Sequence, residues 1–392
     1  MSKKTKRAYK YRFYPTEEQK IILAQTFGCC RFIYNWGLST RKTAYFQHGQ
    51  SLYYNDLAAM LPALKQEYPW LREVSAVPLQ QALRHLDAAY TNFFEGRAEY
   101  PTFKKKRNEQ SATYASNAFT WDGQSLTLAK MTEPLDIRLH RTLPKGCKPS
   151  SVTITKDCAN RYFVSILVED DIKPLPVVNK MVGLDLGIKS MVALSTGEQV
   201  GNPKYFAKDE RKLAKAQRRH ARKKKGSKNR QKARLKVAKI HARIADRRRD
   251  YQHKLSTRIV HENQVMCVES LAVKNMVKNP KLAKAISDVG WGEFVRQLDY
   301  KARWYGRTLV KIDQWYPSSK TCHACKHVVD SLPLDIREWV CPACGTVHDR
   351  DINAALNILA EGLSVAACGG NVRREQVRAS HAVPAEAGNA PS

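Results

Sequence analysis

The spacing of hydrophobic positions in the first hundred residues predicts one strand followed by helices. Residues 8–14 alternate between apolar and polar side chains, as a half-buried strand does, and Pro15 ends that strand. Thr16 and Gln19 have the spacing of a capping box, so a long helix is expected to begin there. Two further helices are expected at 54–64 and 78–94. We interpret residues 15–100 as a small helical domain.

The period of the pattern changes to two beyond residue 100. Short alternating runs separated by turn residues predict strands at 111–116, 118–131, 136–139, 151–156 and 162–168. A series of short strands is typical of a small β-barrel, and the N-terminal strand could belong to it. We therefore expect a β-barrel built from residues 1–14 and 101–180, with the helical domain inserted after its first strand.

Apolar strands and amphipathic helices alternate after the linker at 173–176. Strands are predicted at 181–185, 190–195, 264–268 and 308–312. A long basic helical zone and a helix at 291–305 lie among them, and this order is typical of an α/β layer structure. Residues 365–392 have no aromatic side chain and are rich in Ala, Gly and Pro, so we interpret them as a disordered tail.

The composition indicates a folded, strongly basic protein. Among 392 residues, 67 Lys and Arg face 36 Asp and Glu, which gives a formal net charge of +31. The hydrophobic fraction of 43% supports real cores and excludes a wholly disordered chain. No run approaches the roughly 18–20 apolar residues of a membrane span, and the N-terminus lacks the apolar core of a secretory signal. We expect a cytoplasmic protein with a polyanionic partner and no membrane partner.

The positive charge is concentrated in two parts of the chain. Between Arg211 and Asp250 there are 19 Lys and Arg against two acids, too few for i,i+4 pairing. Such a helix is favourable along a phosphate backbone, where neutralised phosphates release counterions. The alternative is a freely solvated basic helix. The predicted nucleic-acid-binding residues are Lys104, Lys105, Lys106, Arg107, Arg218, Arg219, Arg222 and Lys223.

Four cysteines form two pairs, Cys322-x-x-Cys325 and Cys341-x-x-Cys344, with fifteen residues between the pairs. This spacing matches a zinc ribbon, in which each pair presents two thiolates to one ion. The alternative is a chance arrangement of reduced cysteines. Because thiolates would fill all four positions, we expect one structural Zn²⁺ with no open coordination site. No metal role is expected for the neighbouring histidines, His323, His327 and His348.

Three acidic residues stand at the ends of predicted elements. Asp185 and Glu269 each end an apolar strand, and Asp351 lies where a helix begins. Glycines at 183 and 187 would permit close backbone approach beside Asp185. Carboxylates that converge in this way could hold two Mg²⁺ ions for phosphodiester cleavage. The structural alternatives are a turn residue, a solvated strand end and a helix cap; Asp349 competes with Asp351 as the third ligand, and we prefer Asp351.

Several blocks resemble the TnpB proteins of bacterial insertion sequences, over about residues 8–360. The blocks are NFFEGRAEYPTFKKK, GLDLGIKSMVALSTGE, VMCVESLAVKNM, SDVGWGEFVRQLDYKARWYG, YPSSKTCHACK and CPACGTVHDRDINAALNI. The resemblance implies a wedge-like β-barrel at 1–14 and 101–180 and a helical recognition domain at 15–100. It also implies an RNase H-like (RuvC) nuclease domain at 181–364, with the zinc ribbon inserted at 318–346.

TnpB proteins are RNA-guided DNA endonucleases, relatives of type V CRISPR effectors. The resemblance therefore implies Mg²⁺-dependent cleavage of double-stranded target DNA beside a short flanking motif, with a guide RNA from the transposon end. It implies that Asp185, Glu269 and Asp351 are the metal-binding triad. Gln80 lies in a segment that resembles the motif-reading helix and could bond an adenine edge, although an exposed glutamine is usually only solvated.

Two other functions stay open at this point. A DNA strand-transfer transposase usually orders its acids Asp, Asp, Glu, whereas this chain has Asp, Glu, Asp. A non-cleaving RNA-guided DNA-binding regulator is disfavoured by the intact triad.

Overall fold

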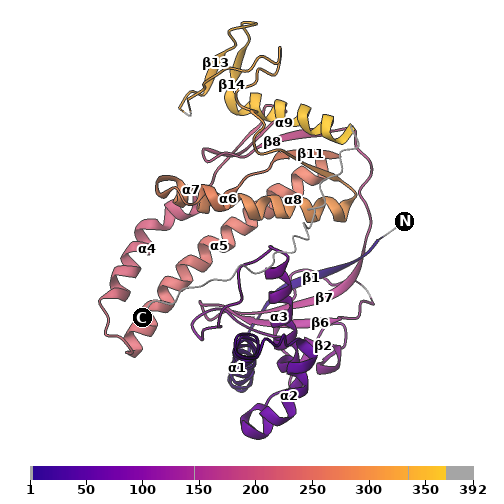
Figure 1. The fold of residues 1–392 in the computed structure, drawn as a ribbon, viewed down its shortest axis with the longest axis vertical. Helices are drawn as coiled ribbons and strands as arrows, with labels where there is room; N and C mark the ends of the chain where they lie inside the picture. The colour runs from indigo at the N-terminus through magenta and orange to yellow at the C-terminus, as the bar shows by residue number, and fades with distance from the viewer. Residues whose placement is uncertain (1–2, 145, 334, 368–392) are drawn as a thin grey trace. The chain divides into compact units, whose positions relative to one another are not determined.

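The computed structural model describes residues 3–144, 146–333 and 335–367, and their contacts form two compact units (Figure 1). Unit 1 takes its residues from Met1–Lys180, Asn202–Gln264 and Val273–Thr308. Unit 2 takes its residues from Met181–Gly201, Val265–Ala272 and Leu309–Ser392. Each unit therefore combines segments that are distant in sequence. The domain boundaries expected from the sequence stay predictions.

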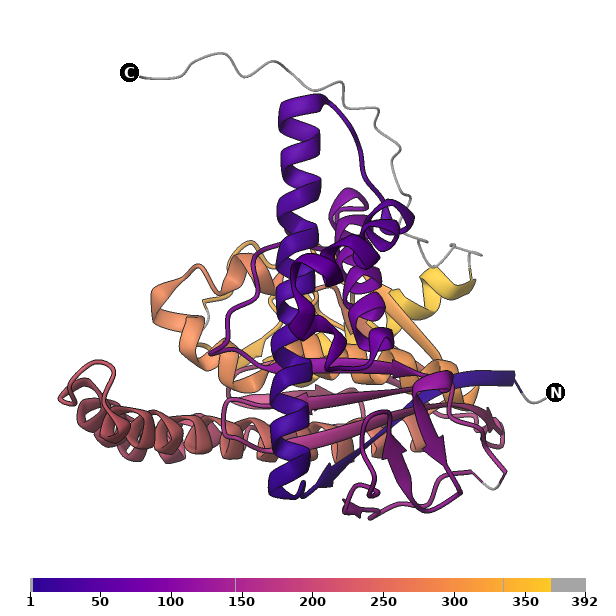
Figure 2. The same ribbon diagram turned by 90° about the horizontal axis from the view of Figure 1, so that it is seen from below.

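The helices near the N-terminus pack on one another and on a sheet of unit 1. They are α1 (Glu17–His48), α2 (Tyr54–Glu67), the 3-10 helix η1 (Pro69–Arg72) and α3 (Ala76–Phe94). The predicted capping box is present: Thr16 and Gln19 each accept the backbone N–H of the other, both at 3.2 Å. Figure 2 shows α1 running across the sheet, and one hydrophobic core joins the helices to the strands.

The sheet of unit 1 has the strand order β2-β6-β7-β1-β5. Its strands are β1 (Lys3–Phe13), β2 (Gln110–Ala115), β5 (Ile137–Arg138), β6 (Ser151–Lys156) and β7 (Tyr162–Ile172). The N-terminal strand joins it, as expected, and pairs antiparallel with β7 from Lys3↔Ile172 to Phe13↔Tyr162. A separate hairpin follows the short helix η2 (Ser116–Ala118) and consists of β3 (Phe119–Trp121) and β4 (Leu126–Leu128).

The expected β-barrel is wrong: the described residues form an open sheet with β2 and β5 at its edges. Closure needs continuous pairing around the whole barrel. The edge strand β5 has two residues and pairs only at Arg12↔Arg138 and Phe13↔Ile137. The residues of β3 and β4 pair with each other, so they add no strand to this sheet.

A long helical hairpin and three further helices complete unit 1. They are α4 (Tyr205–Ala221), α5 (Lys228–Glu262), α6 (Val273–Met276), α7 (Pro280–Val289) and α8 (Trp291–Tyr305). Helices α4 and α5 lie side by side (Figures 1 and 2), and α5 also packs on α8. There the buried Lys301 ammonium donates to the hydroxyls of Ser256 and Thr257, both at 2.7 Å.

Unit 2 is a five-stranded sheet covered by one helix, with a small ribbon attached. Its strands are β8 (Met181–Asp185), β9 (Ser190–Leu194), β10 (Gln199–Gly201), β11 (Val265–Glu269) and β12 (Thr308–Ile312), in the order β10-β9-β8-β11-β12. Helix α9 (Arg350–Ala367) packs on β8, β9 and β11 (Figure 1). The ribbon contains β13 (Glu338–Val340) and β14 (Val347–Asp349).

Helix α9 continues further than the sequence pattern indicated. It ends at Ala367, so the first three residues of the expected disordered tail, 365–392, are helical. The remainder of that tail lies outside the described residues. Within the described part of the chain, no helix is long and apolar enough to cross a membrane.

Candidate functional site

Asp185 and Glu269 are neighbours at the same edge of the unit 2 sheet. They are the last residues of β8 and β11, which pair in parallel with Leu184 opposite Val268. Adjacent strands lie about 4.8 Å apart, so the next residue on each strand places two carboxylates side by side. The preceding residues are apolar and buried, whereas the two acids are half-buried. The sheet therefore brings together two of the three predicted acids.

Helix α9 carries the third acid in its first turn. It begins at Arg350, and Asp349 caps it by accepting the Ile352 N–H at 2.9 Å. The other carboxylate oxygen of Asp349 accepts from Gln199 at 3.0 Å. Asp349 therefore has a structural role, whereas Asp351 follows the cap. Of the two candidates for the third position, this arrangement favours Asp351.

Two glycines let α9 lie directly on the strands that end in the acids. A Cβ at Gly183 of β8 would overlap the carbonyl oxygen of Ala355, and one at Gly362 of α9 would overlap the Cys267 sulfur. At Gly187 a Cβ would lie 2.8 Å from the Ser190 carbonyl oxygen. The close approach expected at Gly183 and Gly187 is thus present; at Gly183 and Gly362 it lets α9 lie against the sheet, whereas at Gly187 it involves Ser190 at the start of β9.

The pKa of Asp185 is affected by the charges of the other two carboxylates. Burial, and then the charges of Glu269 and Asp351, raise the pKa of Asp185 to about 7, while Arg350 opposes them. Burial also raises the pKa of Glu269, against a 3.5 Å hydrogen bond from the Ser318 hydroxyl. A cluster of acids that resist ionisation together suits a divalent cation with oxygen ligands, such as Mg²⁺.

Asp351 has a cationic partner, Arg337, whose Nη1 lies 3.2 Å from its carboxylate. Among the described residues, the four cysteines are the one group of potential metal ligands whose atoms all lie within 4.8 Å of one another. Asp185, Glu269 and Asp351 do not form such a group.

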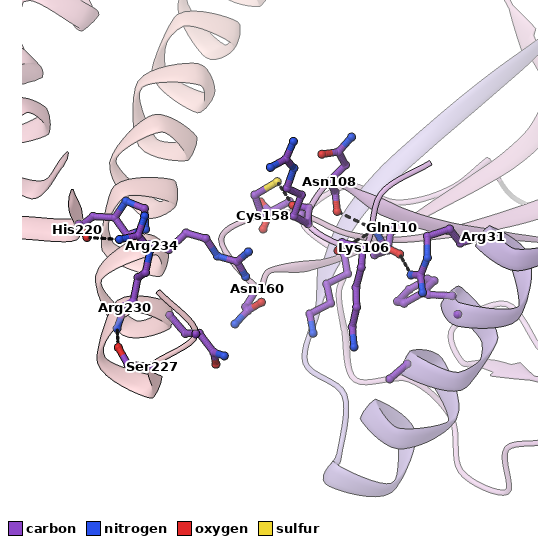
Figure 3. Close-up of a pocket in the computed structure, with 18 residues that line it drawn as sticks. Arg31, Lys106, Asn108, Gln110, Cys158, Asn160, His220, Ser227, Arg230 and Arg234 are labelled. Carbon is purple, nitrogen blue, oxygen red and sulfur yellow. Dashed lines mark hydrogen bonds between the residues drawn. The ribbon is translucent and has the colours of Figure 1, made fainter. Parts of the chain in front are cut away.

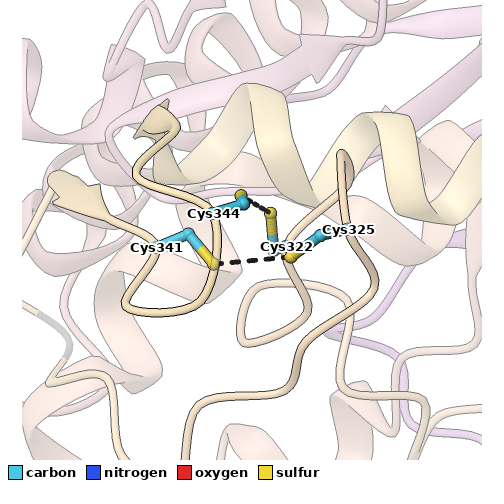
Figure 4. A group of neighbouring side chains, drawn as sticks. All are labelled: Cys322, Cys325, Cys341 and Cys344. Carbon is cyan, nitrogen blue, oxygen red and sulfur yellow. Dashed lines mark hydrogen bonds between the residues drawn. The ribbon is translucent and has the colours of Figure 1, made fainter.

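The four predicted cysteines converge on one point, as Figure 4 shows. The Sγ atoms of Cys322 and Cys344 are 3.7 Å apart, and those of Cys325 and Cys341 are 3.6 Å apart. A tetrahedron with Zn–S bonds of about 2.3 Å has edges of about 3.8 Å, so the sulfurs fit one zinc ion. Hydrogen bonds from Thr346 lower the pKa of Cys344 to about 6, which favours its thiolate.

Buried asparagines connect the cysteine ribbon to α9. Asn353 accepts the His323 N–H at 3.0 Å and donates to the Thr321 carbonyl at 2.8 Å. Asn357 donates to the Ser318 carbonyl at 3.0 Å and to the Thr321 carbonyl at 2.5 Å. The sequence analysis missed these residues, although two asparagines four apart on an apolar helix face were an available signal. His348, for which no metal role was expected, lies beside the cluster, with its Nε2 3.0 Å from the Cys322 sulfur.

Basic residues from distant segments of unit 1 line a cleft of about 750 Å³, here called the basic cleft (Figure 3). Its cationic residues are Arg31, Lys106, Arg107, Lys156, Arg230 and Arg234. Among its lining residues, all of them described, Asp157 alone is acidic, and it pairs with Arg161. The cleft therefore unites part of the 104–107 cluster with the basic hairpin.

A second basic surface, here called the hairpin groove, lies between α4 and α5. Its volume is about 970 Å³. Its cationic residues are Lys212, Lys215, Arg219, Arg222, Lys223, Lys232, Lys236, Lys239 and Arg243. All residues of its lining are described, and none is acidic. Such a surface is unfavourable alone and suits a polyanion.

The remaining predicted nucleic-acid residues do not gather at these surfaces. Gln80 is exposed on α3, and Arg218 is exposed on α4 outside the groove lining. Lys105 lies elsewhere on the chain surface, in a smaller cavity of about 480 Å³. The Lys104 ammonium lies 4.0 Å from the ring centre of Tyr34, and desolvation lowers its pKa, so this charge points inward.

Three family models match the chain. A helix-turn-helix domain model matches residues 1–50, the IS605 OrfB model, described as "Probable transposase", matches residues 163–280, and the Cas12f1-like TNB domain matches residues 291–358. A Streptomyces pristinaespiralis protein named "Putative RNA-guided DNA endonuclease" is 54% identical over 96% of this chain and 94% of its own length. InsQ of Escherichia coli K12, with the same description, is 31% identical over 92% of this chain and 94% of its own.

A solved structure, the Cas12f1–sgRNA–target DNA complex, shares the fold. Its TM-score is 0.55 at 14% identity, over 91% of this chain and 98% of that chain. The shared fold and the similar sequences together place this chain in a class of transposon-encoded proteins with a nuclease-like fold. The chain belongs to the TnpB family, the OrfB proteins of IS605-type elements, which are RNA-guided DNA endonucleases.

Proposed function

We propose that this protein cleaves target DNA beside a short flanking motif, directed by a guide RNA from the transposon end, and that Asp185, Glu269 and Asp351 carry the hydrolysis. The proposal rests on the position of the three acids at the ends of the paired strands β8 and β11 and in the first turn of α9, where Glu269 and Asp351 raise the pKa of Asp185. The order β10-β9-β8-β11-β12 supports an RNase H-like nuclease domain at 181–364. The recognition domain at 15–100 and the wedge-like domain at 1–14 and 101–180 belong to the same proposal.

In this mechanism the three carboxylates would hold two Mg²⁺ ions. When bound, the ions supply an activated water and stabilise charge on the phosphodiester. The sheet sets the separation of Asp185 and Glu269, and α9 brings Asp351 to them. Because Asp185 has a raised pKa, cation binding would favour its ionised form. Arg337 lies 3.2 Å from the Asp351 carboxylate and partly balances its charge.

The other partners follow from the remaining surfaces. Cys322, Cys325, Cys341 and Cys344 would hold one structural Zn²⁺. The basic cleft and the hairpin groove would contact RNA and DNA backbones, while base pairing reads the target. Gln80 is a candidate reader of the flanking motif. A cytoplasmic location, with binding to the nucleoid through DNA, is part of the proposal.

The test is guided cleavage by the protein purified with its native guide RNA. A plasmid that matches the guide should be cut with Mg²⁺ and stay intact when Mg²⁺ is omitted or the guide is scrambled. Asp185→Ala should bind the same RNA and the same plasmid without cutting it. Cutting by Asp185→Ala at the normal rate would exclude the proposed triad.

The product also separates cleavage from DNA strand transfer. The proposed enzyme leaves free DNA ends with a 5′-phosphate, whereas a transposase would join element ends to target DNA. Sequencing of the reaction products distinguishes the two, and joined products would favour the transposase.

A further inference from the structure

Trp315 is a solvent-exposed residue close to the proposed catalytic acids. It lies three residues after β12 in unit 2, and 82% of its surface is exposed. Among the described residues it is the most exposed of the large apolar side chains. An indole is one of the largest apolar surfaces a protein can bury, so leaving it in water forgoes considerable stabilisation.

The turn around Trp315 is well defined, although the ring itself is free of packing. The Trp315 N–H donates to the Asp313 carboxylate at 2.8 Å, and the Tyr316 N–H donates to the Asp313 carbonyl at 3.4 Å. Tyr316 turns inward and packs against the core that includes Ile312 and Ile358. Two adjacent aromatic residues therefore face opposite ways, and the outward one is presented on a fixed backbone.

The same turn reaches the catalytic acids directly. Three residues after Trp315, the Ser318 hydroxyl donates to Glu269 at 3.5 Å. The Ser318 carbonyl accepts from Asn357 of α9 at 3.0 Å, which fixes this end of the turn as well. Three residues span at most about 11 Å, so Trp315 lies within a few nucleotides of a phosphate bound at Glu269.

We propose that Trp315 stacks on an unpaired nucleobase one to three nucleotides from the cleaved phosphodiester and so positions the single strand at the acids. This inference rests on the proposed nuclease function. Every base offers a π-face, so stacking on an indole tolerates any target sequence, as a guided enzyme requires. Trp315 acts as a positioning residue: it holds the strand and touches no reacting atom.

The first test is a double-mutant cycle that combines a substitution at Trp315 with removal of one base from the DNA. The quantity measured is the rate of cleavage of a target that is already single-stranded at the cleavage position. Trp315→Ala should lower the rate about 5- to 100-fold, and Trp315→Phe, which keeps a π-face, should restore most of it. An abasic nucleotide at the stacked position should slow the wild type equally and leave Trp315→Ala unchanged. If the rate reductions caused by Trp315→Ala and by the abasic nucleotide multiply when the two are combined, no base stacks on Trp315 and the proposal fails.

The second test does not depend on cleavage, so it separates failure of this proposal from failure of the nuclease function. In Asp185→Ala, a short single strand of alternating thymidine and 2-aminopurine should lose fluorescence on binding, because stacking on indole quenches 2-aminopurine. Adding Trp315→Ala should remove that quenching. The matched control is Phe94→Ala, which removes an aromatic side chain that is 76% exposed in unit 1 and should leave the quenching intact. Equal quenching with and without Trp315 overturns the proposal.

Discussion

At the residue scale, Asp185 shows how the proposed cation site would lower the stability of the fold that carries it. Its carboxyl lies beside Glu269 and Asp351, and burial removes the water that would screen their repulsion. The folded protein therefore favours the protonated form of Asp185 up to a pH of about 7. A divalent cation reverses this preference because it needs the ionised form.

Asp185→Asn should stabilise the Mg²⁺-free protein at pH 8. The pKa of Asp185 rises from an ordinary 3.8 to about 7 on folding, so the folded state holds the extra proton between these values. The free energy of unfolding of the wild type then falls as pH rises through this window. The amide of Asp185→Asn carries no charge, so the free energy of unfolding of the variant does not fall for this reason. We expect a melting temperature a few degrees above wild type at pH 8 and equal to it near pH 4.

The comparison should use buffer without Mg²⁺ and without chelator, because a chelator would also remove zinc. Asp330→Asn, at an exposed position of unit 2, is the control and should not change the melting temperature at either pH. A lower melting temperature for Asp185→Asn at pH 8 would contradict the repulsion argument.

Among elements, the contact of α9 with β8 sets the geometry of the acids, and Gly183 permits it. Gly183→Ala would drive a Cβ into the Ala355 carbonyl, which belongs to a helix backbone and cannot move alone. We expect a loss of several degrees in melting temperature, or insoluble protein. Gly292→Ala is the control, because nothing lies within 4 Å of its Cβ and alanine favours a helix. Equal stability of both variants would contradict this packing.

The cysteine ribbon is the second element that acts on α9. Cys344→Ser should lower the zinc content, measured by elemental analysis, and loosen the ribbon. Because Thr321 and Ser318 are bonded to Asn353 and Asn357 of α9, we expect cleavage to fall at least about 10-fold while guide RNA stays bound. Cys147→Ser, at a half-buried cysteine outside the cluster and outside both basic surfaces, should retain zinc and activity. Normal cleavage by a variant that has lost zinc would show that the ribbon does not support the geometry of the catalytic acids.

Local patterns predicted the elements better than their assembly. The strands Met181–Asp185 and Thr308–Ile312 and the helix Trp291–Tyr305 have the predicted bounds, because each apolar pattern ends in polar or glycine residues. The barrel failed because closure would require the edge strands β2 and β5 to pair with each other, and β5 has only two residues. The acids were recognisable at apolar strand ends, but Arg337 meets Asp351 only once the ribbon folds on α9. Asn357 acts on the site indirectly, through its hydrogen bond to the Ser318 carbonyl.

At the scale of the whole molecule, the net charge of +31 is organised into surfaces that need an anionic partner. The hairpin groove brings two basic helices together, and its lining, which the structure describes completely, has no acid. Bound phosphates would relieve the repulsion between α4 and α5, and part of the binding free energy would then come from released counterions. The affinity for guide RNA should fall steeply with salt for this reason.

The triple variant Lys215→Ala, Arg219→Ala and Lys236→Ala tests this surface. These residues line the groove and are exposed, so the fold should survive and the melting temperature of the RNA-free protein should not fall. Each lost phosphate contact should make the plot of log affinity against log salt shallower by about 1, or about 3 for the triple variant. The control removes Lys42, Lys278 and Lys281, three exposed lysines outside both basic surfaces. An equal change in slope for both triples would mean that net charge alone binds the RNA, whereas a change confined to the first would identify the hairpin groove as a binding surface.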